Sequence, residues 1–75
     1  MDLADKMTGY ALNEWLAPFT EEEAEDFKEK CRTNPKTVNE FLGNLIEDVE
    51  EYPTDANRSL LTEVTEHYKT LTKEN

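Results

Sequence analysis

The clearest hydrophobic pattern in the chain lies in Thr37–Tyr52, where apolar residues recur every three or four positions. This spacing places them on one face of an α-helix, and glutamates fall on the opposite face. The apolar positions are Val38, Phe41, Leu42, Leu45, Ile46, Val49 and Tyr52, and the acidic ones are Glu40, Glu47, Glu50 and Glu51. Gly43 lies on the side of this predicted helix, where we expect close packing by a neighbouring backbone or, alternatively, a contact with a partner.

Local signals predict a second helix over Glu21–Thr33. Thr20 and Glu23 have the spacing of a capping box, in which each side chain accepts a hydrogen bond from the other residue's backbone N–H. Asn34-Pro35 then breaks the pattern. The central helix begins either with Asn34 as its cap and Pro35 as its first residue, or with Thr37 as its cap and Glu40 closing a second capping box. The apolar stripe of the second helix is narrow and consists of Ala24, Phe27 and Cys31.

Two further helices complete the prediction. A last helix follows Pro53, capped by Thr54 or Asp55, with His67 at the edge of its apolar stripe. That stripe consists of Leu60, Leu61, Val64, Tyr68 and Leu71. A short first helix is expected over Gly9–Ala17.

The signals around the first helix are Thr8 as the preferred N-cap, with Asp2 as the alternative, and Pro18 as the stop. Residues 1–7 and 72–75 are expected to fray. The residues expected to be buried in this helix are Tyr10, Ala11, Leu12, Trp15 and Leu16.

These elements predict a single all-α domain over residues 1–75, a compact bundle of three to four short helices around the central amphipathic helix. With two glycines and three prolines, the chain has too few turn residues for an all-β fold. Short links between helices favour antiparallel neighbours.

The net charge of the chain bears on its function and on the partners that it could bind. The chain has 18 acidic and eight basic side chains, a net charge of −10. Residues 1–52 hold 14 of the acidic and five of the basic ones, so the acidity belongs to the first two thirds. Direct binding of nucleic acid or of an anionic membrane requires a basic face and is therefore not expected. A basic protein partner suits this charge.

Candidate catalytic and metal-binding chemistry is sparse. Cys31 and His67 are the one plausible nucleophile and base, but nearby carboxylates would raise a thiol pKa, and a buried cysteine and a histidine at the core edge are the favoured interpretation. No EF-hand spacing and no glycine-rich phosphate loop occurs. Four short helices also leave little room for a cleft. We therefore expect no enzyme, no cofactor and no specific metal site.

Three features of the sequence bear on the cellular location of the protein. A single cysteine permits no intrachain disulfide. The first residues carry acidic side chains that interrupt any apolar stretch, so they are unlike a signal peptide. No apolar run in the chain approaches the length of a membrane span. The expectation is a cytoplasmic protein, in the host cytoplasm if the source is a phage.

The leading functional hypothesis is an acidic inhibitor or adaptor that docks on a basic, nucleic-acid-binding surface of a larger protein, as phage or plasmid anti-defence and antitoxin-like proteins do. In such a protein carboxylates stand in for phosphates, and Trp15 or Tyr10 would serve as an apolar anchor unless core packing uses it. The basic residues are not interleaved to neutralise the acidic strip. The predicted contact residues are Glu22, Glu25, Asp26, Glu29, Glu47, Glu50 and Glu51. The alternative is a helical homodimerisation module whose acidic face only confers solubility.

Overall fold

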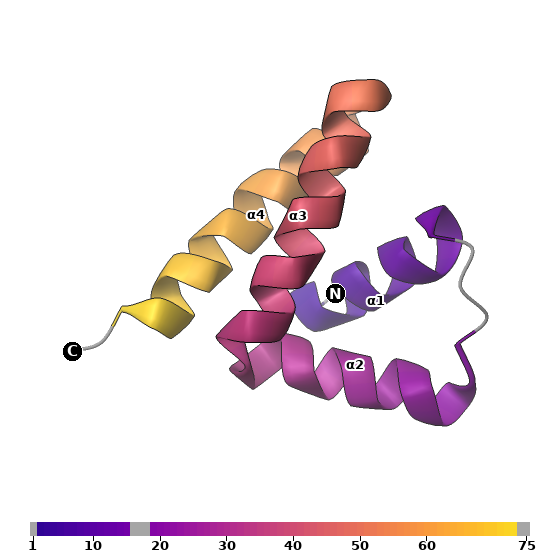
Figure 1. Ribbon diagram of the computed structural model, residues 1–75, viewed down its shortest axis with the longest axis vertical. Helices are drawn as coiled ribbons and strands as arrows, with labels where there is room; N and C mark the ends of the chain where they lie inside the picture. Colours follow the sequence, from indigo (N-terminus) through magenta and orange to yellow (C-terminus); the bar gives the residue numbers. More distant parts are fainter. Residues whose placement is uncertain (1, 16–18, 74–75) are drawn as a thin grey trace.

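The computed structural model describes residues 2–15 and 19–73, and across these residues it contains four α-helices and no strand (Figure 1). The all-α prediction is confirmed. The radius of gyration is 11.9 Å, close to the roughly 11 Å expected of a compact chain of this length. The helices are α1 (Leu3–Glu14), α2 (Glu21–Thr33), α3 (Pro35–Glu51) and α4 (Asp55–Thr72).

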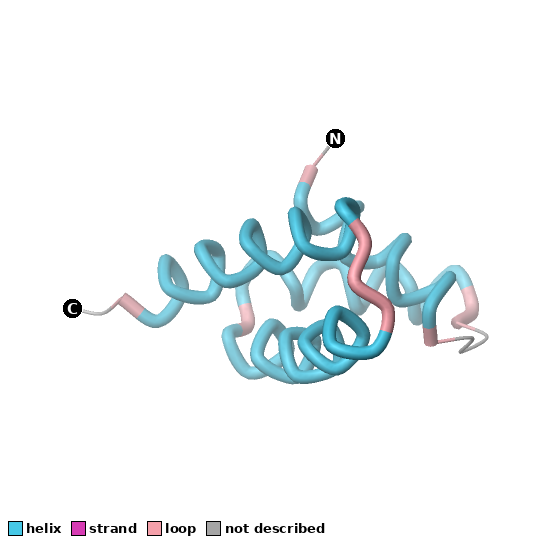
Figure 2. The backbone as a smooth tube through the Cα atoms, turned by 90° about the horizontal axis from the view of Figure 1, so that it is seen from above, coloured by secondary structure: helices cyan, strands magenta, loops and turns pink. Residues whose placement is uncertain are grey.

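The helices form two pairs. α3 packs along α4 and α1 packs along α2, and the pairs meet where α2 touches α3 and α1 touches α4 (Figures 1 and 2). Aromatic rings converge on Phe41 of α3, which is 1% exposed: the ring centroids of Tyr10, Trp15 and Phe27 lie 6.1, 5.3 and 6.2 Å from it. The amphipathic helix predicted to be central therefore supplies the middle of the core.

The core draws apolar side chains from all four helices. Its buried members are Ala4, Met7, Ala11, Cys31, Val38, Phe41, Leu42, Leu45, Leu60 and Val64. Three predicted core residues are instead exposed, namely Leu12 (38%), Ile46 (44%) and Tyr52 (76%). Ile46 lies at the margin of the apolar stripe of α3. Tyr52 is the C-cap of α3 (φ −137°, ψ 73°), so the helical periodicity that predicted its burial no longer applies there.

Side-chain caps begin α2, α3 and α4. Glu23 N donates to Thr20 Oγ1 (3.1 Å) and Thr20 N donates to Glu23 Oε1 (3.0 Å), so the predicted capping box and the bounds of α2 are confirmed. At α3 the first alternative holds, because the side chain of Asn34 accepts from Lys36 N (2.9 Å) and Pro35 is the first helical residue. At α4 the cap is Thr54, in a second capping box with Asn57.

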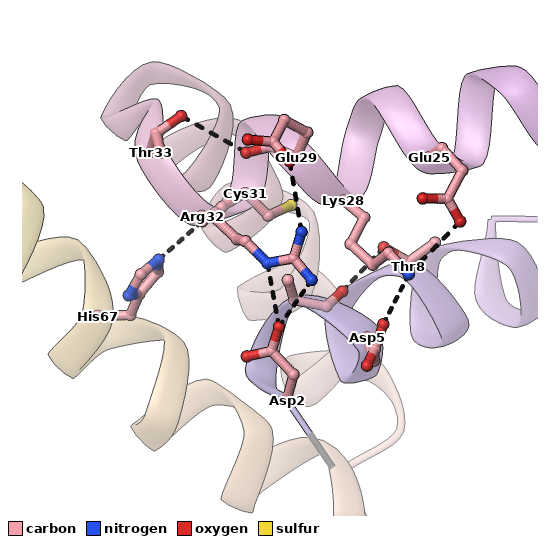
Figure 3. A network of polar contacts seen from close by, with 11 residues as sticks. Asp2, Asp5, Thr8, Glu25, Lys28, Glu29, Cys31, Arg32, Thr33 and His67 are labelled. Carbon is pink, nitrogen blue, oxygen red and sulfur yellow. Dashed lines mark hydrogen bonds and ion pairs between the residues drawn. The ribbon is translucent and has the colours of Figure 1, made fainter.

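The first helix differs from the prediction. It begins at Leu3, so residues 3–7 are helical rather than frayed, and Thr8 lies inside the helix, where its hydroxyl donates to the carbonyl of Ala4 (2.8 Å). Ion pairs with α2 hold the early turns: Arg32 Nη2 to Asp2 Oδ2 (3.0 Å) and Lys28 Nζ to Asp5 Oδ1 (2.9 Å) (Figure 3).

Other predictions concern the end of the first helix and the C-terminus of the chain. The first helix ends at Glu14 with Trp15 as its C-cap, so the predicted end at Ala17 is wrong. The predicted burial of Leu16 and the stop at Pro18 concern residues outside the described part. At the other end, α4 continues to Thr72 with Lys73 as its C-cap, and residues 74–75 lie outside the described part.

The close packing expected at Gly43 is wrong. A Cβ atom built on Gly43 would meet nothing within 4 Å, because this side of α3 faces open space. The glycine is therefore not required for the approach of a neighbouring helix.

Candidate partner-binding surface

The seven carboxylates predicted to contact a partner are all exposed, but they form two groups. The α2 group is Glu22, Glu25, Asp26 and Glu29, and the α3 group is Glu47, Glu50 and Glu51. α3 starts at the C-terminal end of α2 and then runs beside α4. This course takes the last turns of α3 away from α2 (Figure 1). The last turns of α3 therefore do not extend the acidic surface of α2.

Most of the α2 group is paired with cations on the same helix. Glu25 lies 3.5 Å from Lys28, Asp26 lies 3.1 Å from Lys30, and Glu29 lies 3.4 Å from Arg32. The expectation that basic residues are not interleaved is therefore wrong for α2. The spacing of three or four residues between partners is visible in the sequence and predicts such pairs.

Two of these cations also bind α1, as Figure 3 shows. Hydrogen bonding to Arg32 lowers the pKa of the Asp2 carboxyl, and hydrogen bonding to Asp5 raises the pKa of the Lys28 ammonium. Much of the positive charge on α2 therefore joins it to α1, and the nearby carboxylates have structural partners.

The α3 group has no such partners. No lysine or arginine occurs between Lys36 and Arg58. Within the described part of the chain, Glu47, Glu50 and Glu51 form no ion pair. Glu50 and Glu51 also occupy the negative end of the helix dipole, where an acidic side chain costs roughly 0.3–1 kcal/mol. These carboxylates oppose the stability of the helix that carries them.

A groove of about 600 Å³ lies between α2 and the start of α3. The groove is shallow and open to solvent, in agreement with the expectation that four short helices leave little room for an enclosed cleft. The apolar part of the lining comes from aromatic rings, and most of the polar part from carboxylates. The lining residues are Phe19, Glu22, Glu23, Asp26, Phe27, Lys30, Thr37 and Glu40. Here the acidic surfaces of α2 and α3 do meet.

Six of these groove residues were not among the predicted contacts, namely Phe19, Glu23, Phe27, Lys30, Thr37 and Glu40. A signal for the aromatic pair exists in the sequence, since Phe19 and Phe27 are eight residues apart and flank the acidic run of α2. Their rings meet edge to face at 5.8 Å. Glu40 required the structure, because no local pattern shows which turn of α3 lies beside α2.

The two candidate aromatic anchors pack against the core. Trp15 and Tyr10 both approach Phe41, and the Tyr10 hydroxyl donates to Asp48 Oδ2 (2.9 Å). Burial, followed by this hydrogen bond, raises the pKa of Tyr10 to about 12. Trp15 Nε1 is buried and has no hydrogen-bond acceptor among the described residues. The core alternative therefore holds for both rings.

The side chain of His67 contacts the backbone of Cys31 and not its thiol. The imidazole Nε2 lies 2.7 Å from the carbonyl oxygen of Cys31. The Cys31 side chain is 0% exposed, as predicted, and burial raises the pKa of its thiol to about 12. Burial rather than neighbouring carboxylates is the cause. The described residues contain no group of three or more His, Cys, Asp or Glu side chains placed to hold a metal ion.

Comparison with known proteins gives no relative: no protein-family model, curated protein or solved structure matches this chain. In the described ranges, none of the helices combines the length and the apolar character needed to cross a membrane.

Proposed function

We propose that this chain is a small, non-catalytic protein-binding module, an inhibitor or adaptor that docks its carboxylates on a basic surface of a larger protein. The observation that supports it most is the end of α3, where Glu47, Glu50 and Glu51 are exposed and without ion pairs among the described residues. Like charges at the negative end of a helix dipole lower stability. A role in binding accounts for a feature that folding does not favour.

The partner surface we propose is one that binds nucleic acid, as in phage or plasmid anti-defence and antitoxin-like proteins. Glu40, Glu47 and Glu51 are spaced by seven and four residues, so they lie near one line along α3, about 10 and 6 Å apart along its axis. Such a row of negative charges along a rod resembles what a phosphate backbone presents. The proposed setting is a cytoplasm, and binding would be fast and sensitive to salt.

A pull-down from the native cell or host, washed across a salt series, tests this proposal. The bait is the intact protein, compared with Glu47→Lys/Glu51→Lys and with the control Glu14→Lys/Glu66→Lys. Both double variants change exposed glutamates and have the same net charge. We expect a basic partner that is released as ionic strength rises towards about 0.5 M, is lost with the α3 variant and is retained by the control. Equal capture by all three baits contradicts the proposal.

A second candidate function is a helical homodimer, in which the acidic face only keeps the protein in solution. Leu12 of α1 favours it, because this large apolar side chain is 38% exposed. Sedimentation at high protein concentration separates the two candidates: a dimer that persists at high salt supports the second, and a monomer contradicts it.

A further inference from the structure

We propose that the groove between α2 and α3 binds a basic peptide segment of the partner, in which an apolar side chain is flanked by arginines or lysines. This inference rests on the proposed function and adds the chemistry that the partner must present. Two phenylalanine rings and four carboxylates line this groove together.

Charge complementarity argues for a basic occupant. Four carboxylates line the groove, from Glu22, Glu23, Asp26 and Glu40, against the single ammonium of Lys30. Lys30 already pairs with Asp26 at 3.1 Å, and Glu23 accepts the Thr20 backbone N–H of the capping box. Within the described ranges, the carboxylates of Glu22 on α2 and Glu40 on α3 form no ion pair and accept no hydrogen bond from another side chain, since the Asn44 amide donates to the backbone carbonyl of Glu40. These two carboxylates, one from each helix, are free to receive cations.

The aromatic lining argues for an apolar side chain between those cations. Phe19 and Phe27 are both partly exposed, and their rings meet edge to face at 5.8 Å. Phe27 continues inward to Phe41, with ring centroids 6.2 Å apart. An apolar side chain placed here removes the exposed parts of two rings from water, and a neighbouring arginine or lysine gains cation–π attraction.

The walls of the groove are held in place by contacts within the protein before any peptide binds. The capping box holds the first turn of α2, and Phe27 is locked between Trp15 and Phe41. Two walls that are already ordered lose little conformational entropy when a peptide binds.

Titration of the ¹⁵N-labelled protein with a short capped peptide, arginine–lysine–leucine–arginine–lysine, tests this proposal by NMR. We expect saturable amide shifts concentrated in residues 19–30 and 37–40. Replacing the leucine by glycine in the peptide should weaken binding roughly fivefold, because the aromatic contact is lost. The double variant Glu22→Gln/Glu40→Gln should weaken it by a similar factor.

The control variant is Glu14→Gln/Glu66→Gln, which has the same net charge and changes two exposed glutamates that lie outside the groove and are not among the proposed contact residues. It should change the affinity less than twofold, and circular dichroism confirms that each variant is folded. Shifts spread over all acidic residues, with equal weakening by both variants, overturn the groove but leave an acidic binding face intact. Complete absence of binding at low salt also overturns the groove, whereas the proposed function is decided separately, by the pull-down with the α3 variant.

Discussion

The imidazole Nε2 of His67 on α4 donates a hydrogen bond to the main-chain carbonyl of Cys31 on α2, over 2.7 Å (Figure 3). In a continuing helix this carbonyl would accept the N–H of the residue four positions later, which here is Pro35 and has none. His67 therefore satisfies a carbonyl that the break between α2 and α3 leaves open. The same proline that begins α3 creates the need for this contact.

Substituting His67→Ala should lower the free energy of unfolding by about 1 kcal/mol, because the carbonyl of Cys31 loses its donor. Urea denaturation followed by circular dichroism measures this change. The control is His67→Gln, whose amide nitrogen reaches a similar position and should restore part of the loss. Equal stability of the alanine variant and the natural protein would show that water replaces the imidazole without cost.

The thiol of Cys31 should be inert in the folded protein. It is fully buried and burial raises its pKa to about 12, so both access and thiolate are lacking near pH 8. A thiol reagent such as dithionitrobenzoate should react slowly with the native protein and at once in denaturant. Rapid native reaction, at a rate independent of urea, would contradict the buried position of this residue.

Stability should fall in alkali. The pKa of Cys31 is raised from 9.0 and that of Tyr10 from 10.0, each to about 12. A pKa raised by folding means that the folded state holds the proton more tightly, so stability is fully present below pH 9 and is lost as pH rises towards 12. Urea midpoints measured from pH 8 to 11.5 should decline, and in Cys31→Ala the decline should begin near pH 10 instead of pH 9. A flat profile would contradict the burial of both groups.

Substituting Gly43→Ala should raise the stability of the protein by roughly 0.5–1 kcal/mol, because alanine favours the helix and its Cβ meets nothing within 4 Å. Urea denaturation measures the gain. Gly9→Ala on α1 is the matched variant, since Gly9 is also helical and its added Cβ also meets open space. Destabilisation by either change would mean that a neighbouring helix approaches more closely than the structure shows.

The parts of the fold that sequence predicts well are those decided by neighbouring residues. The bounds of α2 follow from Thr20, Glu23 and the Asn34-Pro35 break, all within one or two turns of the ends they determine. α1 begins after the alternative cap, Asp2, and not after the preferred cap, Thr8, and the ion pair that favours this earlier start joins Asp2 to Arg32, 30 positions away. No local pattern contains such a contact.

The candidate surface also combines features that neighbouring residues determine with features that depend on the tertiary structure. Exposure of the seven carboxylates follows from helical periodicity and was predicted. The spacing of three residues between Glu25 and Lys28 also predicts their pairing, which the net charge alone does not show. The groove depends on which turn of α3 meets α2, so Glu40 beside Phe27 could come only from tertiary structure.

The central claim is that the carboxylates at the end of α3 serve binding at the expense of folding. Glu51→Lys tests it most directly, because a lysine in the last turn suits the helix dipole and lies four residues after Glu47. The control is Glu66→Lys, an exposed glutamate on α4 with the same change of charge. Its ion pair with Lys69 is exposed and spans 3.9 Å, so the loss of that pair should cost little stability.

The decisive measurement pairs the urea unfolding free energy of both variants with their affinity for the partner recovered in the pull-down. We predict that Glu51→Lys gains roughly 0.5–1 kcal/mol of stability and loses at least about fivefold in affinity, whereas Glu66→Lys changes little in either. A Glu51→Lys protein that is no more stable than the natural one, or that binds the partner as tightly, would contradict the account.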